Sequence, residues 1–207
     1  MLSVHQLSFD YPAQTLSKRT TPLLHQVSWA LASGQMLHIR GANGSGKTTL
    51  LKLLAGLFRP DEGHITYDAQ DIWSDLSSYQ QNIRYLGHKN GLSPALTPIE
   101  HGQLDICALP AQSILDALLH QLSLWEVRAL PCHLLSAGQK RRVALLRLRM
   151  SSAKLWLLDE PLVALDEAGI QVLMSFLQEH IASGGQVVYT SHHPLPWISA
   201  MHQDYLL

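Results

Sequence analysis

The stretch "HIRGANGSGKTTLLKLLAGL", residues 38–57, decides the fold, because its glycines stand between an apolar run and a leucine-rich run. Residues 41–48 fit the pattern G-x-x-x-x-G-K-[ST]. Glycines let backbone N–H groups turn inward, and the helix that follows begins with unpaired N–H groups and a partial positive charge. A strand that passes into a helix through such a loop is typical of a phosphate site. The alternative, a chance match, does not account for this placement.

Each residue type in the loop suits one part of a nucleotide triphosphate. Backbone N–H groups approach the phosphate oxygens, and Lys47 places a positive charge on the outer phosphates. The hydroxyl of Thr48 can bind Mg²⁺. We therefore expect ATP and Mg²⁺ as cofactors, with ATP bound by Gly41, Ala42, Asn43, Gly44, Ser45, Gly46, Lys47, Thr48 and Thr49.

A second candidate site follows the apolar run of residues 155–158, which ends in Asp159 and Glu160. Adjacent strand residues face opposite ways, so the two acids can have different tasks. We expect Asp159 to hold Mg²⁺, directly or through water, and Glu160 to accept a proton from the attacking water. The alternative is a strand end with two solvated acids, which the presence of the phosphate loop makes less attractive.

The order of the patterns predicts an α/β fold. Strand patterns at residues 35–41, 83–88, 154–161 and 184–192 alternate with helical patterns at residues 48–57 and 167–183. Short links between them favour a parallel, doubly wound sheet. Residues up to about Gly34 suggest short strands and turns, and residues 93–150 suggest helices. We expect one domain over 1–207, with a core of 1–92 and 151–207 and an inserted helical subdomain of 93–150.

Composition excludes several classes of protein. The 207 residues are 46% hydrophobic and 15% charged, and the net charge of −1 offers no global basic field, so nucleic acid is not an expected partner. No apolar run approaches the ~18 residues of a membrane span. The first residues, "MLSVHQLSFDYP", lack a basic region followed by an apolar stretch, so we expect no secretory signal and a cytoplasmic location.

Cysteine and histidine spacing predicts no metal site. The two cysteines, Cys107 and Cys132, are not in a CxxC pattern, and we expect reduced thiols without a role. The chain has 12 histidines but neither an HxH nor an HExxH pattern. Metal binding by histidine is therefore not expected.

The stretch "LLSAGQKRRVALLRL", residues 134–148, carries a family resemblance. Residues 135–139 resemble the LSGGQ motif of ATP-binding cassette (ABC) proteins, with Ala137 in place of the first glycine. A small-residue turn ahead of a helix can bind an anion through the Ser136 hydroxyl and the Gly138 N–H. The resemblance implies a P-loop NTPase fold with an N-terminal antiparallel β part. It also implies a homodimer that encloses two ATP molecules, with Ser136, Gly138 and Gln139 facing the ATP of the other copy.

The resemblance implies roles for four more positions. Asp166 in "ALD" lies in the D-loop at the dimer interface, and His192 at the end of "VVYTSH" contacts the γ-phosphate. His193 would point the opposite way from His192, so we expect it to be structural. Tyr11 in "FDYP" stacks on adenine; Phe9 is the rival, and a plain core aromatic is the third possibility. His88 stands where the family has a glutamine, and the lone pair of a neutral imidazole can replace that carbonyl oxygen. The alternative for His88 is a polar loop residue.

The basic residues after the turn allow two interpretations. Arg141, Arg142, Arg147 and Arg149 fit a solvated basic helix face. Alternatively, Arg142 or its neighbours brace the helical subdomain. The sequence leaves the choice open.

The chain resembles one subfamily, the ATP-binding subunits of the cytochrome c maturation system. The features that carry this resemblance are the loop with "GH", the segment "LTPIEH" and the compact length. The resemblance implies ATP hydrolysis that powers haem export or the release of a haem-loaded chaperone. It implies integral membrane subunits (CcmB-like and CcmC-like) as partners, and a peripheral position on the cytoplasmic face of the inner membrane.

Three other functions were weighed against this one. The same ATPase can serve lipoprotein release or a small solute. A cassette that acts on DNA or ribosomes needs long arms, a zinc insertion or a second cassette, for which 207 residues leave no room. A regulatory protein that does not hydrolyse ATP is opposed by the intact Lys47, Asp159, Glu160 and His192.

Overall fold

The computed structural model describes residues 1–11, 22–104, 112–191, 195 and 202–207. Its strands are β1 (Leu2–Phe9), β2 (Leu24–Leu31), β3 (Met36–Arg40), β4 (Glu62–Tyr67), β5 (Gln70–Asp71), β6 (Ile83–Leu86), β7 (Leu155–Asp159), β8 (Gln186–Thr190) and β9 (His202–Leu206). Its helices are α1 (Lys47–Leu54), α2 (Leu76–Gln81), α3 (Pro98–Leu104), α4 (Gln112–Gln121), α5 (Ala137–Met150) and α6 (Glu167–Ala182), with short 3₁₀ turns at Trp125–Val127 and Cys132–Leu134.

The core is a five-stranded sheet in the order β6-β7-β8-β3-β9, in which every neighbouring pair is parallel. The residues of β7 and β8 are buried throughout, as expected for strands covered on both faces. The carboxyl ends of parallel strands meet at one edge of the sheet. The phosphate loop after β3 and the acids at the end of β7 therefore belong to the same edge, so the predicted parallel sheet is confirmed.

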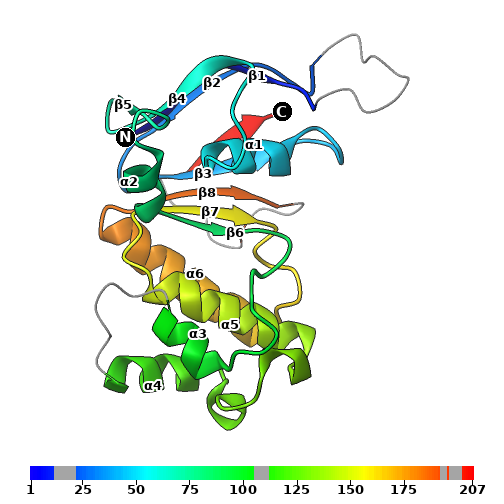
Figure 1. Cartoon of the computed structure of the whole chain (residues 1–207), viewed down its shortest axis with the longest axis vertical. Helices are drawn as coiled ribbons and strands as arrows, with labels where there is room; N and C mark the ends of the chain where they lie inside the picture. The colour runs from blue at the N-terminus through cyan, green and yellow to red at the C-terminus, as the bar shows by residue number, and fades with distance from the viewer. Residues whose placement is uncertain (12–21, 105–111, 192–194, 196–201) are drawn as a thin grey trace.

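The two faces of this sheet bury separate hydrophobic cores, as the alternation of strand side chains requires. Leu155 and Leu157 of β7 pack in the core that contains α1, whereas Trp156 and Leu158 pack in the core that contains α5 and α6. Figure 1 shows α1 above the sheet and the helices α3 to α6 below it. Burial of one such leucine contributes about 1.5–3 kcal/mol.

A smaller antiparallel sheet in the order β2-β1-β4-β5 covers α1 from the side opposite the core sheet (Figure 1). Its buried residues Leu2, Val4 and Leu7 share the hydrophobic core of α1. The helix therefore lies between two sheets, which fixes the position of the loop that precedes it. The antiparallel part and the helices complete the expected fold class.

Some element boundaries differ from the sequence patterns for local reasons. The helix expected over 48–57 ends at Leu54, because Gly56 adopts φ 67 and the backbone N–H of Leu57 turns back to the carbonyl of Lys52. The short helix α2 and the strand β9 were not predicted. The sequence "HQDYL" of β9 is mostly exposed and polar, so it lacks the apolar pattern of the other core strands. Within the described ranges, no helix is both long and apolar enough to cross a bilayer.

Candidate functional site: a phosphate loop beside paired acids

The loop between β3 and α1 depends on glycines at three positions. The backbone φ angles of Gly41, Gly44 and Gly46 are 152°, 80° and 101°, values that residues other than glycine rarely adopt. A Cβ atom on Gly41 would lie 2.6 Å from Ser45 Oγ and 2.8 Å from the carbonyl oxygen of Leu207. A Cβ atom on Gly44 would meet nothing within 4 Å, so the tip of the loop faces open space.

The polar groups of the loop fit a phosphate ligand. Lys47 Nζ donates hydrogen bonds to the carbonyl oxygens of Gly41 (2.8 Å) and Ala42 (2.9 Å), which holds the ammonium group over the loop. Ser45 Oγ is buried and has no hydrogen-bond partner among the described residues. A buried hydroxyl without an acceptor is uncommon, and a phosphate oxygen would supply one. The loop thus combines an unused donor, a cation and the start of α1.

Asp159 connects this loop to the core sheet. Its Oδ2 accepts a hydrogen bond from Thr48 Oγ1 (2.9 Å), and its Oδ1 accepts one from Thr190 Oγ1 (2.7 Å). Asp159 is only 3% exposed, so these oxygens lie in a protected position. Hydroxyl and carboxylate oxygens are the hard ligands that Mg²⁺ prefers. The two residues expected to hold the metal are therefore together.

Thr190 was missed by the sequence reasoning. It stands directly beside Asp159 in the register of β7 and β8. Its hydroxyl oxygen also accepts a hydrogen bond from the backbone N–H of Glu160 (3.2 Å). A threonine at the end of an apolar strand gives no signal by itself; only the pairing of β7 with β8 shows its importance.

Glu160 follows Asp159 with a strained backbone. Its φ is 47°, in the left-handed region that costs roughly 1–2 kcal/mol for a residue with a side chain. The backbone on both sides is held: its N–H donates to the Thr190 carbonyl (3.1 Å), and its own carbonyl accepts from Arg141 Nη2 (2.7 Å). This turn redirects the chain directly after Asp159.

Arg141 corrects one interpretation of the basic helix face. It is 3% exposed, so it does not belong to a solvated surface. Burial lowers the pKa of the guanidinium, while the nearby acids Asp159 and Glu160 raise it. Its acceptors are the carbonyl oxygens of Gly87 (3.2 Å), Asp159 (3.3 Å), Glu160 (2.7 Å) and Pro161 (3.4 Å), and Asn90 Oδ1 (3.0 Å). One buried cation thus joins α5 to the loops after β6 and β7.

Arg142 braces the helical region, as one alternative expected. Its Nη2 donates to both carboxylate oxygens of Asp166 (2.6 and 2.8 Å), and its Nη1 donates to the carbonyl of Leu122 (3.2 Å). The hydrogen bonds from Arg142 lower the pKa of Asp166. Asp166 is also the N-cap of α6, where its Oδ1 accepts a hydrogen bond from the backbone N–H of Gly169 (3.0 Å). Arg149 forms an exposed ion pair with Glu179, which fits the solvated face.

The Ser136 turn begins α5 with a capping box. Ser136 Oγ accepts from the backbone N–H of Gln139 (3.2 Å), and Gln139 Oε1 accepts from the backbone N–H of Ser136 (2.9 Å). A Cβ atom on Gly138 would lie 3.2 Å from the carbonyl of Ala164, so the turn lies against the loop that leads into α6. The helix α5 is on the opposite side of the core sheet from α1 (Figure 1).

The remaining candidate residues are placed as follows. Tyr11 is 46% exposed, and its hydroxyl is 3.1 Å from Thr49 Oγ1, whereas the rival Phe9 is buried. The rings of Tyr11 and Phe9 form a cluster with Phe58, which the sequence reasoning missed.

His88 is exposed in the loop after β6. Cys132 is a buried free thiol whose pKa is raised by burial. His192, His193 and Cys107 lie outside the described residues.

Known proteins resemble this chain over most of its length. The family model described as ABC transporter matches residues 24–163. The cytochrome c biogenesis ATP-binding export protein CcmA of Legionella pneumophila (strain Lens) is 48% identical over 207 residues, which is 100% of both chains. A protein of the same name from Pseudomonas fluorescens (strain Pf0-1) is 42% identical over 185 residues, 88% of this chain and 87% of that one. A solved ATP-binding subunit of an ABC transporter has a TM-score of 0.82 at 26% identity, covering 92% of this chain and 79% of that one.

Proposed function

Because this chain belongs to the ABC transporter family, we propose that it is the ATP-hydrolysing subunit of an exporter for cytochrome c biogenesis. The observation that carries the proposal is the full-length identity of 48% with a protein of that name. It is supported by the arrangement of Lys47, Thr48 and Asp159 around one edge of the core sheet.

The phosphate loop binds ATP through its backbone N–H groups. Lys47 exchanges the carbonyl oxygens of Gly41 and Ala42 for the outer phosphates, because an anion is the better partner for an ammonium group. Thr48 and Asp159 hold Mg²⁺, which when bound offsets the charge of the phosphates. Tyr11 offers adenine an exposed aromatic ring whose orientation is held by Thr49 and Phe9.

Glu160 is the general base in this proposal. Its backbone N–H donates to Thr190, and its carbonyl oxygen accepts from Arg141. These two hydrogen bonds hold the Glu160 backbone, and with it the position of the Cβ atom. A fixed carboxylate within reach of the attacking water accepts its proton without first having to be ordered. His192, outside the described residues, completes the site by contact with the γ-phosphate.

The second half of the site comes from a facing copy of the chain. In the proposed dimer, Ser136, Gly138 and Gln139 at the start of α5 face the ATP of the other copy, and Asp166, which caps α6, lies at the interface. In one copy, α5 lies across the core sheet from α1, which supports a site formed by the phosphate loop of one copy and the start of α5 of the other (Figure 1). The active form is therefore a homodimer that closes over two ATP molecules.

The work of the dimer is transmitted to integral membrane subunits, CcmB-like and CcmC-like, at the cytoplasmic face of the inner membrane. The cargo is haem or a haem-loaded chaperone. Lipoprotein release and small-solute transport are not favoured, because the Legionella and Pseudomonas relatives that match this chain nearly end to end are cytochrome c biogenesis proteins. No feature of the charge distribution supports nucleic acid as a partner.

Two variants of His88 test whether the imidazole replaces the family's glutamine. We expect His88→Gln to keep most of the membrane-stimulated ATPase activity, because the amide supplies an oxygen acceptor in place of the ring nitrogen. His88→Ala should lower that activity by about 10-fold or more. Steady-state ATPase assays on the complex with its membrane subunits measure both. Activity equal to the unmodified protein in both variants would make His88 an ordinary polar loop residue.

The cellular role is tested by deleting the gene and staining membrane proteins for covalently bound haem. We expect c-type cytochromes to be lost, and to return when the gene is supplied on a plasmid. A plasmid copy with Lys47→Ala should fail to restore them, because the lysine supplies the charge at the outer phosphates. Unchanged haem staining in the deletion strain would refute the role in cytochrome c biogenesis while leaving ATP hydrolysis intact.

A further inference from the structure

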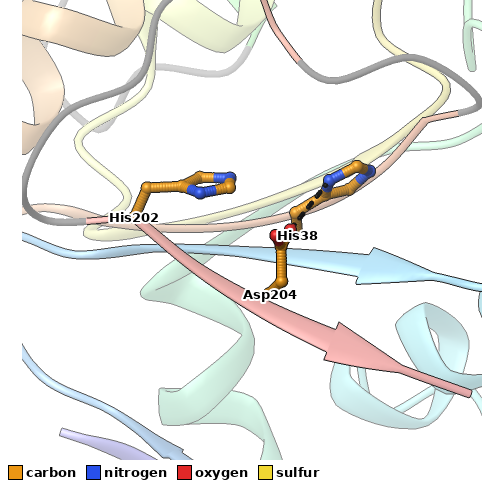
Figure 2. Close-up of side chains that lie close together, drawn as sticks. All are labelled: His38, His202 and Asp204. Carbon is orange, nitrogen blue, oxygen red and sulfur yellow. Dashed lines mark ion pairs between the residues drawn. The ribbon is translucent and has the colours of Figure 1, made fainter.

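Three side chains that could bind a metal ion gather on one face of the core sheet, apart from the phosphate loop. His38 of β3 stands beside Asp204 of β9 in the parallel register, and His202 lies two residues earlier on β9. Residues two apart on a strand share a face, so both β9 side chains point the same way. Figure 2 shows the two imidazoles and the carboxylate around a common space. One ligand atom from each lies within 4.8 Å of the others.

Both polar partners of His38 are oxygen atoms. Its Nε2 is 3.1 Å from the carbonyl oxygen of Ser191, and its Nδ1 is 3.2 Å from Asp204 Oδ1. Both partners are acceptors, but a neutral imidazole has only one N–H. If Nε2 donates to Ser191, the lone pair of Nδ1 faces a carboxylate oxygen. In that tautomer, a metal ion between Nδ1 and Oδ1 would give both atoms a partner.

Burial and ring stacking hold His38 in this position. His38 is 2% exposed, and desolvation lowers the pKa of its ring, although the Ser191 carbonyl and the Asp204 carboxylate oppose that effect. The ring of Tyr189 also stacks on His38, with centroids 4.4 Å apart, and keeps it in this orientation. A divalent ion between Nδ1 and Oδ1 would satisfy both atoms without charging the ring.

The second imidazole is held in the same manner. His202 Nε2 is 2.9 Å from the hydroxyl of Tyr189. When Nε2 donates its proton to Tyr189, Nδ1 is left with its lone pair. Ligating histidines usually donate their other N–H to an oxygen in this way. Nε2 of His38 lies beside the Ser191 carbonyl oxygen and Nε2 of His202 beside the Tyr189 hydroxyl, so each ring has an oxygen to which its N–H can donate.

We propose that His38 Nδ1, a ring nitrogen of His202 and Asp204 Oδ1 form a binding site for a divalent ion of the Zn²⁺ class, with water as the fourth ligand. In tetrahedral coordination with bonds of ~2.1 Å, neighbouring ligand atoms are about 3.4 Å apart. The separation of 3.2 Å between His38 and Asp204 already matches that spacing. Two imidazoles and one carboxylate suit Zn²⁺ better than Mg²⁺, which prefers oxygen ligands and bound water.

The ion would tie the last strand to the core beside the phosphate loop. Arg40 Nη1 lies 3.6 Å from the other oxygen of Asp204, which leaves Oδ1 for the metal. Just beyond, the backbone N–H of Leu207 donates to the carbonyl of Arg40 (2.8 Å), and Leu207 lies against Gly41. The site thus holds β9 in place behind the first glycine of the loop.

The test uses the purified full-length protein after chelator treatment, without nucleotide and with excess Mg²⁺ to occupy the oxygen site of Thr48 and Asp159. Co²⁺ is the probe, because its visible absorption distinguishes tetrahedral from octahedral coordination. We expect intense tetrahedral bands that saturate at one ion per chain and disappear when Zn²⁺ is added. His202→Asn and Asp204→Asn should each weaken Co²⁺ binding by about 10-fold or more.

The matched control is His25→Asn, which removes an exposed histidine from β2 and should leave binding unchanged. Retained ATP binding by each variant shows that it is folded. The proposal fails if Co²⁺ gives only weak octahedral bands. It also fails if the folded Asp204→Asn and His202→Asn variants bind Co²⁺ as tightly as the unmodified protein.

Discussion

Glu160→Gln is expected to abolish ATP turnover while preserving ATP binding. The amide cannot accept a proton from the attacking water, and loss of a general base lowers kcat by roughly 10²–10⁴-fold. The change keeps the size of the side chain, so the turn held by Thr190 and Arg141 is preserved. Since ATP then persists between two copies, the variant should accumulate as a dimer.

Two measurements check this expectation. Single-turnover assays with radiolabelled ATP report the chemical step, and size-exclusion chromatography with Mg²⁺ and ATP reports the dimer. Glu167→Gln is the control, because Glu167 is exposed at the start of α6 and should tolerate the change. Normal turnover by Glu160→Gln would remove Glu160 from its role. Loss of ATP binding would instead point to damage in the neighbouring Asp159 cluster.

Arg141→Met is expected to destabilise the protein by about 3–5 kcal/mol, the range for removal of one partner from a buried charged network. Methionine fills part of the volume but donates no hydrogen bond. The carbonyl groups of Gly87, Asp159 and Glu160 are then left without the guanidinium. A buried acceptor that loses its partner costs about 1–3 kcal/mol. The melting temperature should fall by roughly 10 °C.

Urea unfolding followed by circular dichroism measures this loss. The matched control is Arg149→Met on the same helix, where the ion pair with Glu179 is exposed and contributes at most about 1 kcal/mol. Arg141→Lys should recover only part of the stability, because an ammonium group cannot reach several carbonyl groups at fixed angles. Equal stability of Arg141→Met and Arg149→Met would contradict the bracing role of Arg141.

The phosphate loop could be predicted from the sequence because its chemistry is local. The glycines, Lys47 and Thr48 are consecutive, so their spacing alone defines the loop. The strand that ends in Asp159 could be predicted for a similar reason, because an apolar run that stops at two adjacent acids forms one continuous pattern. The fold class needed more than these two segments: it followed from the alternation of strand and helix patterns along the chain and from the resemblance of residues 135–139 to the LSGGQ motif.

The residues that the sequence did not reveal depend on contacts between distant segments. Arg141 looks like its neighbours on a basic helix, and only the packing of α5 against the loops after β6 and β7 buries it. Thr190 matters because β8 pairs with β7. The grouping of His38, His202 and Asp204 requires β9 to lie beside β3. No spacing rule could find that group, because residues 38 and 202 are brought together by strand order alone.

The left-handed conformation of Glu160 has a consequence for durability. A glycine would accept φ 47° without strain and would relax the chain at this point, but it would remove the carboxylate. A glycine at this position would therefore favour stability, whereas the proposed catalytic role requires glutamate. If Glu160 is the general base proposed above, its backbone strain is a cost in stability that accompanies catalysis.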